Sequence, residues 1–228
     1  MSDVNGVKQT RKEKAAATRR RIIAAAAEEF VHSGYHGTAM TAIAKRAGYA
    51  VQTVYFVFHT KAELFAAALD TAVLGPEGKP PLDQDWARDA VGDLTDPTAT
   101  IRAFIQGGAQ IYERAAALSE VARAAAPTDP DAFAVYQSRE ELRIRGYRDF
   151  MAMLADALPS HVNRDRAADI LTTMTSPQLY LAFRHDRGWS HPQTVDWMTA
   201  TIPDLVLGSV TVGPRVDPSF VTAALGVS

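Results

Sequence analysis

Uncharged side chains that form hydrogen bonds gather in one short segment, residues 51–58. Gln52, Thr53 and Tyr55 can each donate to or accept from nucleic-acid base edges and phosphates. The apolar pattern predicts this segment as a helix about 12 Å long, comparable to the width of the DNA major groove. The chemistry indicated is recognition of a nucleic acid rather than catalysis.

Three further predicted elements surround this helix and would position it. Apolar residues recur every three or four positions from Thr18, which predicts an amphipathic helix that ends at Gly34. A short helix follows from Thr38, whose hydroxyl is expected to cap it, and a tight turn at Gly48 leads into residues 51–58. Another helix begins near Thr60. Two short helices joined by a glycine-containing turn are the layout of a helix-turn-helix.

The order and spacing of residues in this region match a known pattern. They include Gly-Tyr after the first helix, Ala-Gly in the turn, a Tyr-centred third helix and Lys-x-x-Leu at the start of the fourth. The matching residues are Gly34, Tyr35, Thr38, Ile43, Ala44, Ala47, Gly48, Thr53, Tyr55, Phe58, Lys61, Glu63 and Leu64. With the leading helix, the segment resembles the DNA-binding domain of the TetR family of one-component bacterial repressors over about 50 residues.

The resemblance implies roles for individual residues. Phosphate contacts would come from Thr38, Tyr55 and Lys61, with His59 as an addition, and base-edge contacts from Val51, Gln52, Thr53 and Phe56. Phe56 has a second interpretation, packing between helices, and Tyr35 and Phe58 are expected in the core.

This chain departs from the family pattern at three places in the same segment. Ala50 replaces the usual Ser before the recognition helix, Gln52 replaces a small Gly, and Val57 replaces a His. Loss of the capping hydroxyl should weaken the helix start by about 1 kcal/mol. The departures affect the expected operator sequence, not the expected fold.

Charge is distributed unevenly along the 228 residues. Residues 1–64 hold ten Lys and Arg against five Asp and Glu, whereas the remainder holds 14 basic and 21 acidic side chains. A basic first quarter suggests contact with a polyanion. Residues 1–17, which include Lys8, Arg11, Lys12 and Lys14, are predicted to be a flexible basic arm.

Cysteine is absent from the sequence, and no apolar run is long enough to span a membrane. Disulfide scaffolds, thiolate metal sites and cysteine nucleophiles are therefore excluded. The sequence predicts a protein of the cytoplasm that does not associate with membranes.

The remaining sequence predicts more helices and no strand before residue 208, so the expected fold class is all-α. Proline after Asp96, Asp129 and Ser176 marks helix starts, because proline is tolerated at the first helical position. The predicted helices are residues 97–117, 119–126, 130–157, 164–175, 177–187 and 192–207, after a loop at 75–83. The predicted organisation is a helix-turn-helix domain at 18–64, a larger helical domain at 65–208 and a tail at 209–228.

The resemblance implies that the larger domain binds a small effector and dimerises through its last helices. Aromatic and methionine side chains suit a pocket for a largely apolar ligand; the candidates are Phe104, Tyr112, Tyr136, Tyr147, Phe150, Met151 and Met174. Candidate dimer residues are Ile170, Leu171, Met174, Leu179, Leu181, Trp197, Met198, Ile202, Leu205 and Val206. The dimer residues could equally fill the core of one chain, and the pocket residues are of the kind that any helical core shows. Gly107-Gly108 indicates either close helix packing or a bend.

No motif for an enzyme is present, no cofactor is expected, and the spacing of His185, Asp186 and His191 fits no standard metal site. The leading hypothesis is a homodimeric repressor, released by a small molecule of unknown identity, that binds an inverted-repeat operator in double-stranded DNA. The alternatives are a helical enzyme or metal-binding domain, and a helical adaptor that binds an acidic partner through its N-terminal segment.

Overall fold

The computed structural model describes residues 10–75, 78–92 and 94–208. Within these ranges all regular structure is helical and no strand is present, which confirms the predicted all-α class. No helix among the described residues is both long and apolar enough to cross a membrane. The predicted tail at 209–228 and residues 1–9 lie outside the described residues.

The helices follow one another with short connections. They are α1 (Arg11–Gly37), α2 (Met40–Ala47), α3 (Val51–Val57), α4 (Lys61–Leu74), the 3-10 turn η1 (Pro81–Asp83), α5 (Asp85–Ala90), α6 (Pro97–Ala125), α7 (Pro130–Met153), α8 (Arg164–Met174), α9 (Pro177–Leu181), the π-helical turn η2 (Ala182–Asp186) and α10 (His191–Leu207).

Helix α1 begins seven residues before the predicted start at Thr18. The Thr10 side chain accepts a hydrogen bond from the Glu13 backbone N–H, and the Glu13 side chain accepts one from the Thr10 backbone N–H. This reciprocal capping box starts the helix at Arg11. The prediction of a flexible arm is therefore wrong for residues 11–17. At the other end, Gly34 breaks the helical path with a φ of 69°, as predicted.

The helix starts that proline marked are confirmed. Asp96, Asp129 and Ser176 each accept a hydrogen bond from a backbone N–H of the first turn that follows. The start of α10 is similar, because Ser190 and Gln193 form a second capping box. These starts were predictable because the interactions that fix them lie within four residues.

Two predictions for the larger domain are wrong, and one helix was missed. The expected break near residue 118 does not occur, because Leu118 and Ala122 are buried along one continuous helix α6. Helix α7 ends at Met153 rather than at residue 157. Helix α5 was not predicted; its six residues are too few for a periodic signal, and its placement depends on contacts with α6.

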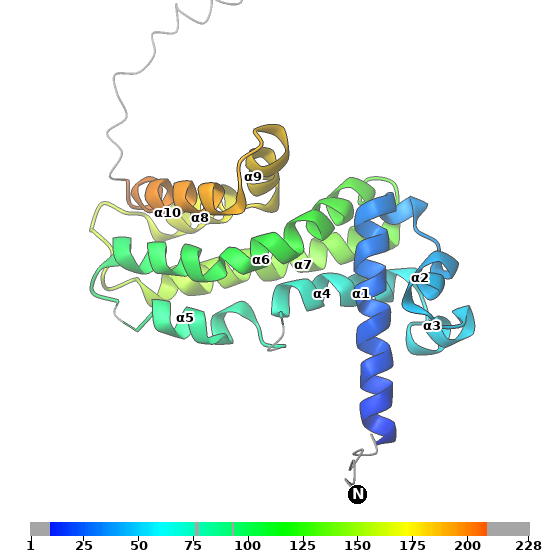
Figure 1. Cartoon of the computed structure of the whole chain (residues 1–228). Coiled ribbons are helices and arrows are strands. Elements are labelled where there is room, and N and C mark those ends of the chain that lie inside the picture. The colour runs from blue at the N-terminus through cyan, green and yellow to red at the C-terminus, as the bar shows by residue number, and fades with distance from the viewer. Residues whose placement is uncertain (1–9, 76–77, 93, 209–228) are drawn as a thin grey trace, which may run out of the picture.

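Two hydrophobic clusters hold these helices together. The first joins α1 to α4 with the end of α6 and the start of α7, and the second joins α5, most of α6, the end of α7 and α8 to α10. Figure 1 shows α6 and α7 side by side along the molecule, with α1 crossing α4 near one end and α8 and α10 near the other. Helix α6 therefore contributes to both clusters and connects the two ends of the molecule.

The glycine pair in α6 permits close packing of an indole ring. A Cβ atom built on Gly107 would lie 2.6 Å from Cε3 of Trp86, whereas one built on Gly108 would meet the same ring at 3.5 Å, an ordinary contact. The Trp86 ring also packs on Phe104, with the ring centroids 5.4 Å apart. Of the two interpretations of the glycine pair, the structure supports close packing.

The two glycines should therefore respond in opposite ways to the same substitution. Gly107→Ala is expected to lower the free energy of unfolding by about 1–3 kcal/mol, because overpacking against Trp86 exceeds the gain in helix propensity. Gly108→Ala is expected to raise it by up to about 1 kcal/mol. Urea denaturation of both variants measures the difference, and equal stabilisation by both would contradict the close contact at Gly107.

Candidate nucleic-acid interface

Helices α2 and α3 are joined by the predicted tight turn. Gly48 has φ 74° and ψ 34°, a left-handed conformation that favours glycine, and its N–H donates to backbone carbonyls at the end of α2. The Tyr49 N–H donates to the Ala44 carbonyl at 3.0 Å. Local backbone geometry therefore sets the angle at which α3 leaves α2.

Helix α3 is fixed by one buried face and leaves the other free. Val54 is fully buried and Phe58, which follows the helix, is 2% exposed. On the opposite face Gln52 is exposed, Tyr55 is 48% exposed and Phe56 is 83% exposed. Helix α3 carries no charged side chain, so its free face offers hydrogen bonds and aromatic surface alone.

This arrangement decides the alternative that the sequence left open for Phe56. An 83% exposed ring does not pack between helices. Val51 and Thr53 are half-buried at the start of α3, beside the exposed Gln52. Tyr35 and Phe58 are buried, as expected of core residues.

Thr38 does not cap α2, contrary to the prediction. The N-cap is Ala39, which makes no side-chain capping bond. The Thr38 hydroxyl points back to the end of α1, at 2.7 Å from the Gly34 carbonyl and 3.1 Å from the Glu29 carbonyl. At 3% exposure, its side chain has little surface to offer a phosphate.

Lys61 and His59 sit where α3 passes into α4. The Lys61 Nζ donates to the Tyr35 carbonyl at 3.0 Å and lies 4.4 Å from the centroid of the Tyr35 ring. Lys61 thus joins the start of α4 to the end of α1, a role that its sequence position did not reveal. His59 is exposed, and its backbone N–H donates to Glu63.

Three arginines that the resemblance did not single out lie close to the helix-turn-helix. The Arg19 guanidinium lies 4.3 Å from the centroid of the Phe58 ring, and that of Arg21 lies 5.7 Å from the Tyr49 ring. Arg46 on α2 forms ion pairs with Glu28 and Glu29 of α1, and these hydrogen bonds raise the pKa of its guanidinium. The signal that could have found Arg19 and Arg21 is their place in the last turn before the buried part of α1.

A group of three aromatic rings joins α1 to α4. The ring centroids of Phe30 and Phe65 are 4.6 Å apart, and those of Tyr35 and Phe65 are 5.2 Å apart. Burial, followed by the charges of Asp129 and Asp131 near the start of α7, raises the pKa of Tyr35 to about 12. The Tyr35 hydroxyl therefore stays neutral at physiological pH.

The residues proposed for an effector pocket do not all lie together. Phe104 stacks on Phe150 with centroids 3.8 Å apart, and Phe150 and Met151 are fully buried. Tyr112, Tyr147 and Met174 belong to the same cluster, whereas Tyr136 packs against the other one.

Tyr112 is the polar centre of that cluster. Burial, followed by the neighbouring Tyr147, raises the pKa of its hydroxyl well above the usual value. Arg143 stands over the Tyr147 ring, pairs with Glu140 and donates to the Thr172 carbonyl at 2.7 Å. These are the polar groups nearest to any ligand that enters the cluster.

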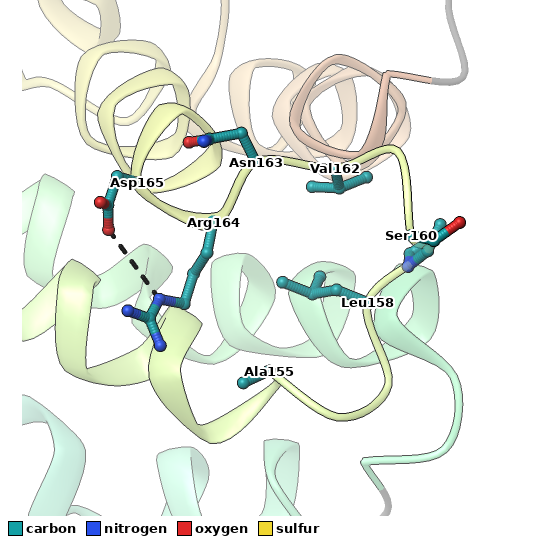
Figure 2. A pocket seen from close by; sticks show the side chains of 8 residues that line it. Ala155, Leu158, Ser160, Val162, Asn163, Arg164 and Asp165 are labelled. Carbon is teal, nitrogen blue, oxygen red and sulfur yellow. Dashed lines mark ion pairs between the residues drawn. The ribbon is translucent and has the colours of Figure 1, made fainter.

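Two surface hollows lie elsewhere. One of about 400 Å³ lies at the connection from α7 to α8, where Figure 2 shows Leu158 and Val162 beside the ion pair of Arg164 and Asp165. The other, of about 600 Å³, is lined by α1, the end of α3 and α4, and includes Arg19, Phe58 and His59. Neither hollow is lined by the residues predicted to bind an effector.

The candidate dimer residues divide into two groups. Leu171, Met198, Ile202 and Val206 are buried within one chain, so the core interpretation holds for these four. The other six are half-buried on α8, α9 and α10; they are Ile170, Met174, Leu179, Leu181, Trp197 and Leu205.

Comparisons with known proteins agree with this geometry. Residues 22–68 match the family model described as "Bacterial regulatory proteins, tetR family". PfmR, a TetR family transcriptional regulator from Thermus thermophilus, shares 20% identity, with 82% of this chain and 97% of that chain covered at a TM-score of 0.61. A transcriptional regulator from Rhodococcus sp. Rha1 shares 20% identity, with 86% and 99% covered at a TM-score of 0.58. No curated protein sequence matches the chain.

A helix-turn-helix joined to a larger helical domain is the architecture of a DNA-binding transcriptional regulator. Residues 22–68 therefore match the TetR family of bacterial regulatory proteins in sequence, and most of the chain shares the fold of a TetR family regulator.

Substitutions on the buried face of α3 should lower stability, whereas substitutions on its exposed face should not. Val54→Ala is expected to lower the free energy of unfolding by about 2 kcal/mol, because it removes buried methyl groups and leaves a cavity. Phe56→Ala on the exposed face should change it by no more than about 0.5 kcal/mol. Urea denaturation tests both, and a large drop in stability for Phe56→Ala would mean that its ring is packed.

Proposed function

We propose that the chain is a homodimeric repressor that binds an inverted-repeat operator through α3 and is released by a small, largely apolar ligand. The observation that carries the proposal is the free face of α3. It presents Gln52, Tyr55 and Phe56 to solvent while Val54 and Phe58 anchor the helix from behind.

The chemistry of this face suits direct reading of bases. A glutamine can bond an adenine edge with both of its polar atoms, and an aromatic ring can contact a thymine methyl group. Thr53 at the edge of the face adds a hydroxyl, and Tyr55, His59 and Lys61 lie toward the far end, where phosphates would pass. In this proposal, α3 contacts the bases, and residues at its far end and beyond it contact the DNA backbone.

The proposal of a dimer rests on apolar side chains of α8 and α10 that one chain leaves half-buried. Ile170 and Met174 are spaced by four residues on α8, and Trp197 and Leu205 by eight on α10, so each pair shares a helix face. Two copies of such a helix pair would form a four-helix bundle. A two-fold axis would then present two α3 helices to an inverted repeat.

The proposal of release by a ligand rests on the cluster around Tyr112. Aromatic rings offer contact area and tyrosine hydroxyls offer orientation. Because Phe104 and Phe150 stack directly on each other, a ligand has to separate packed groups to enter. A ligand that stabilises the opened form more than the closed one would shift the equilibrium between them.

Substitutions on the free face of α3 should change which DNA sequence the protein prefers, whereas substitutions at phosphate-contacting residues should not. Gln52→Ala should alter the preferred base at one position of each half-site, by about 1–3 kcal/mol, because the side chain that bonds the base edge is removed. Lys61→Ala should weaken binding about equally on all sequences and make the salt dependence shallower by about one unit per site.

The measurement is a selection of bound duplexes from a random pool, followed by titration at several salt concentrations. Thr41→Ala serves as the control, since Thr41 is exposed on the helix-turn-helix but lies on α2. Equal effects of Gln52→Ala on every sequence would contradict base reading by α3.

A charge on α10 should prevent dimerisation. Leu205→Glu is expected to convert the protein from a dimer to a monomer, because the carboxylate would lose its hydration in the interface without gaining a partner. Leu142→Glu is the matched control, since Leu142 is 55% exposed on α7 and outside the proposed interface. Light scattering at micromolar concentration gives the mass, and a monomeric wild-type protein would contradict the proposal.

A further inference from the structure

The first two turns of α1 extend away from the rest of the molecule. Residues 11–16 are all exposed, and burial begins at Ile22 and Ile23. Figure 1 shows this part of α1 projecting beyond the other helices. The capping box at Thr10 and three consecutive alanines, residues 15–17, favour helix here without tertiary packing.

This projecting segment ends, in the direction of the chain, where α1 comes close to α3. Arg19 lies over the Phe58 ring at the end of α3, and Arg21 over the Tyr49 ring just before its start. The residues that precede Arg19 therefore continue past the helix-turn-helix. At 1.5 Å per residue, the eight residues from 11 to 18 reach about 12 Å further.

The segment is strongly basic. Together with the three residues that follow it, it carries Arg11, Lys12, Lys14, Arg19, Arg20 and Arg21 against the single acidic residue Glu13. Lys12 precedes Arg19 by seven residues, about two turns, so both lie on the face of α1 that meets α3. Among the described residues, no ion pair involves Arg11, Lys12 or Lys14.

We propose that residues 11–20, the basic extension of α1, contact DNA backbone phosphates that flank the bases read by α3. This inference rests on the proposed function, because α3 must first bring the duplex alongside. The partner chemistry follows from charge: helix α3 has none, and the basic extension adds cations for the phosphates beyond Lys61 at the start of α4. A helix, unlike a flexible arm, holds these cations at fixed positions outside the half-site, and the contact is independent of base sequence.

The test replaces Arg11, Lys12 and Lys14 together by Gln, which keeps helix propensity and removes three charges. The matched control replaces Arg145, Arg148 and Arg164, which are exposed on α7 and α8, by Gln. Fluorescence anisotropy measures affinity for a 40-bp duplex of random sequence and for a duplex that the wild-type protein selects, over a series of salt concentrations.

The expected result is a salt dependence that becomes shallower by about 0.9 for each phosphate that the variant no longer neutralises, to the same extent on both duplexes, with no change in the control. Hydroxyl-radical footprints should lose protection at their outer edges and keep it at the centre. An unchanged slope and footprint would overturn the inference, as would a change in molecular mass without a change in DNA affinity, which would assign the basic extension to an acidic protein surface.

A second variant tests the rigid helix separately from its charge. Ala15→Gly with Ala16→Gly keeps every cation and weakens the helix, and it should lose the outer protection while the central protection remains. Full outer protection in this variant would overturn the role of the helix. If the wild-type protein binds neither duplex, the proposed function fails instead, so the two failures are distinguishable.

Discussion

Contacts among the rings of Phe30, Tyr35 and Phe65 join α1 to α4, the helices that precede and follow α2 and α3 in the chain. Phe30 belongs to α1, Tyr35 follows the break in that helix at Gly34, and Phe65 belongs to α4. The Lys61 side chain also donates to the Tyr35 carbonyl. This bond joins the end of α1 to the start of α4, and α2 and α3 lie between these two points in the chain. Val54 and Phe58 anchor α3 in the same hydrophobic cluster as these rings, so the position of α3 depends on that cluster as well as on the Gly48 turn.

Helix α4 is also bonded to two helices of the larger domain, α6 and α7. Asp70 of α4 receives two hydrogen bonds from Arg139 of α7, at 2.9 and 2.7 Å, and Arg114 of α6 donates to the Ala72 carbonyl at 2.9 Å. The first hydrophobic cluster also includes residues of α6 and α7. Helix α4 is thus bonded to α6 and α7, and a change in the packing of these two helices would reach α3 through it.

Features fixed by neighbouring residues were predictable from the sequence, and those fixed by distant ones were not. The Asp-Pro and Ser-Pro helix starts, the Gly34 break and the Gly48 turn depend on residues within one turn. The start of α1 was missed because helical periodicity begins only where burial begins, although the capping box was present in the sequence. The inward hydroxyl of Thr38 and the separation of Tyr136 from Tyr112 depend on how whole helices pack. The boundary between the two domains at residues 64 and 65 stays a prediction, because Phe65 shares a cluster with both α1 and α6.

Amide hydrogen exchange, with and without a duplex selected by the protein, shows directly whether α3 and its flanking residues form the DNA-binding surface. We expect DNA to slow exchange in peptides that cover residues 38–61 and to leave peptides that cover residues 164–207 unchanged. Protection of residues 164–207 together with unchanged exchange at residues 38–61 would contradict this assignment of the surface.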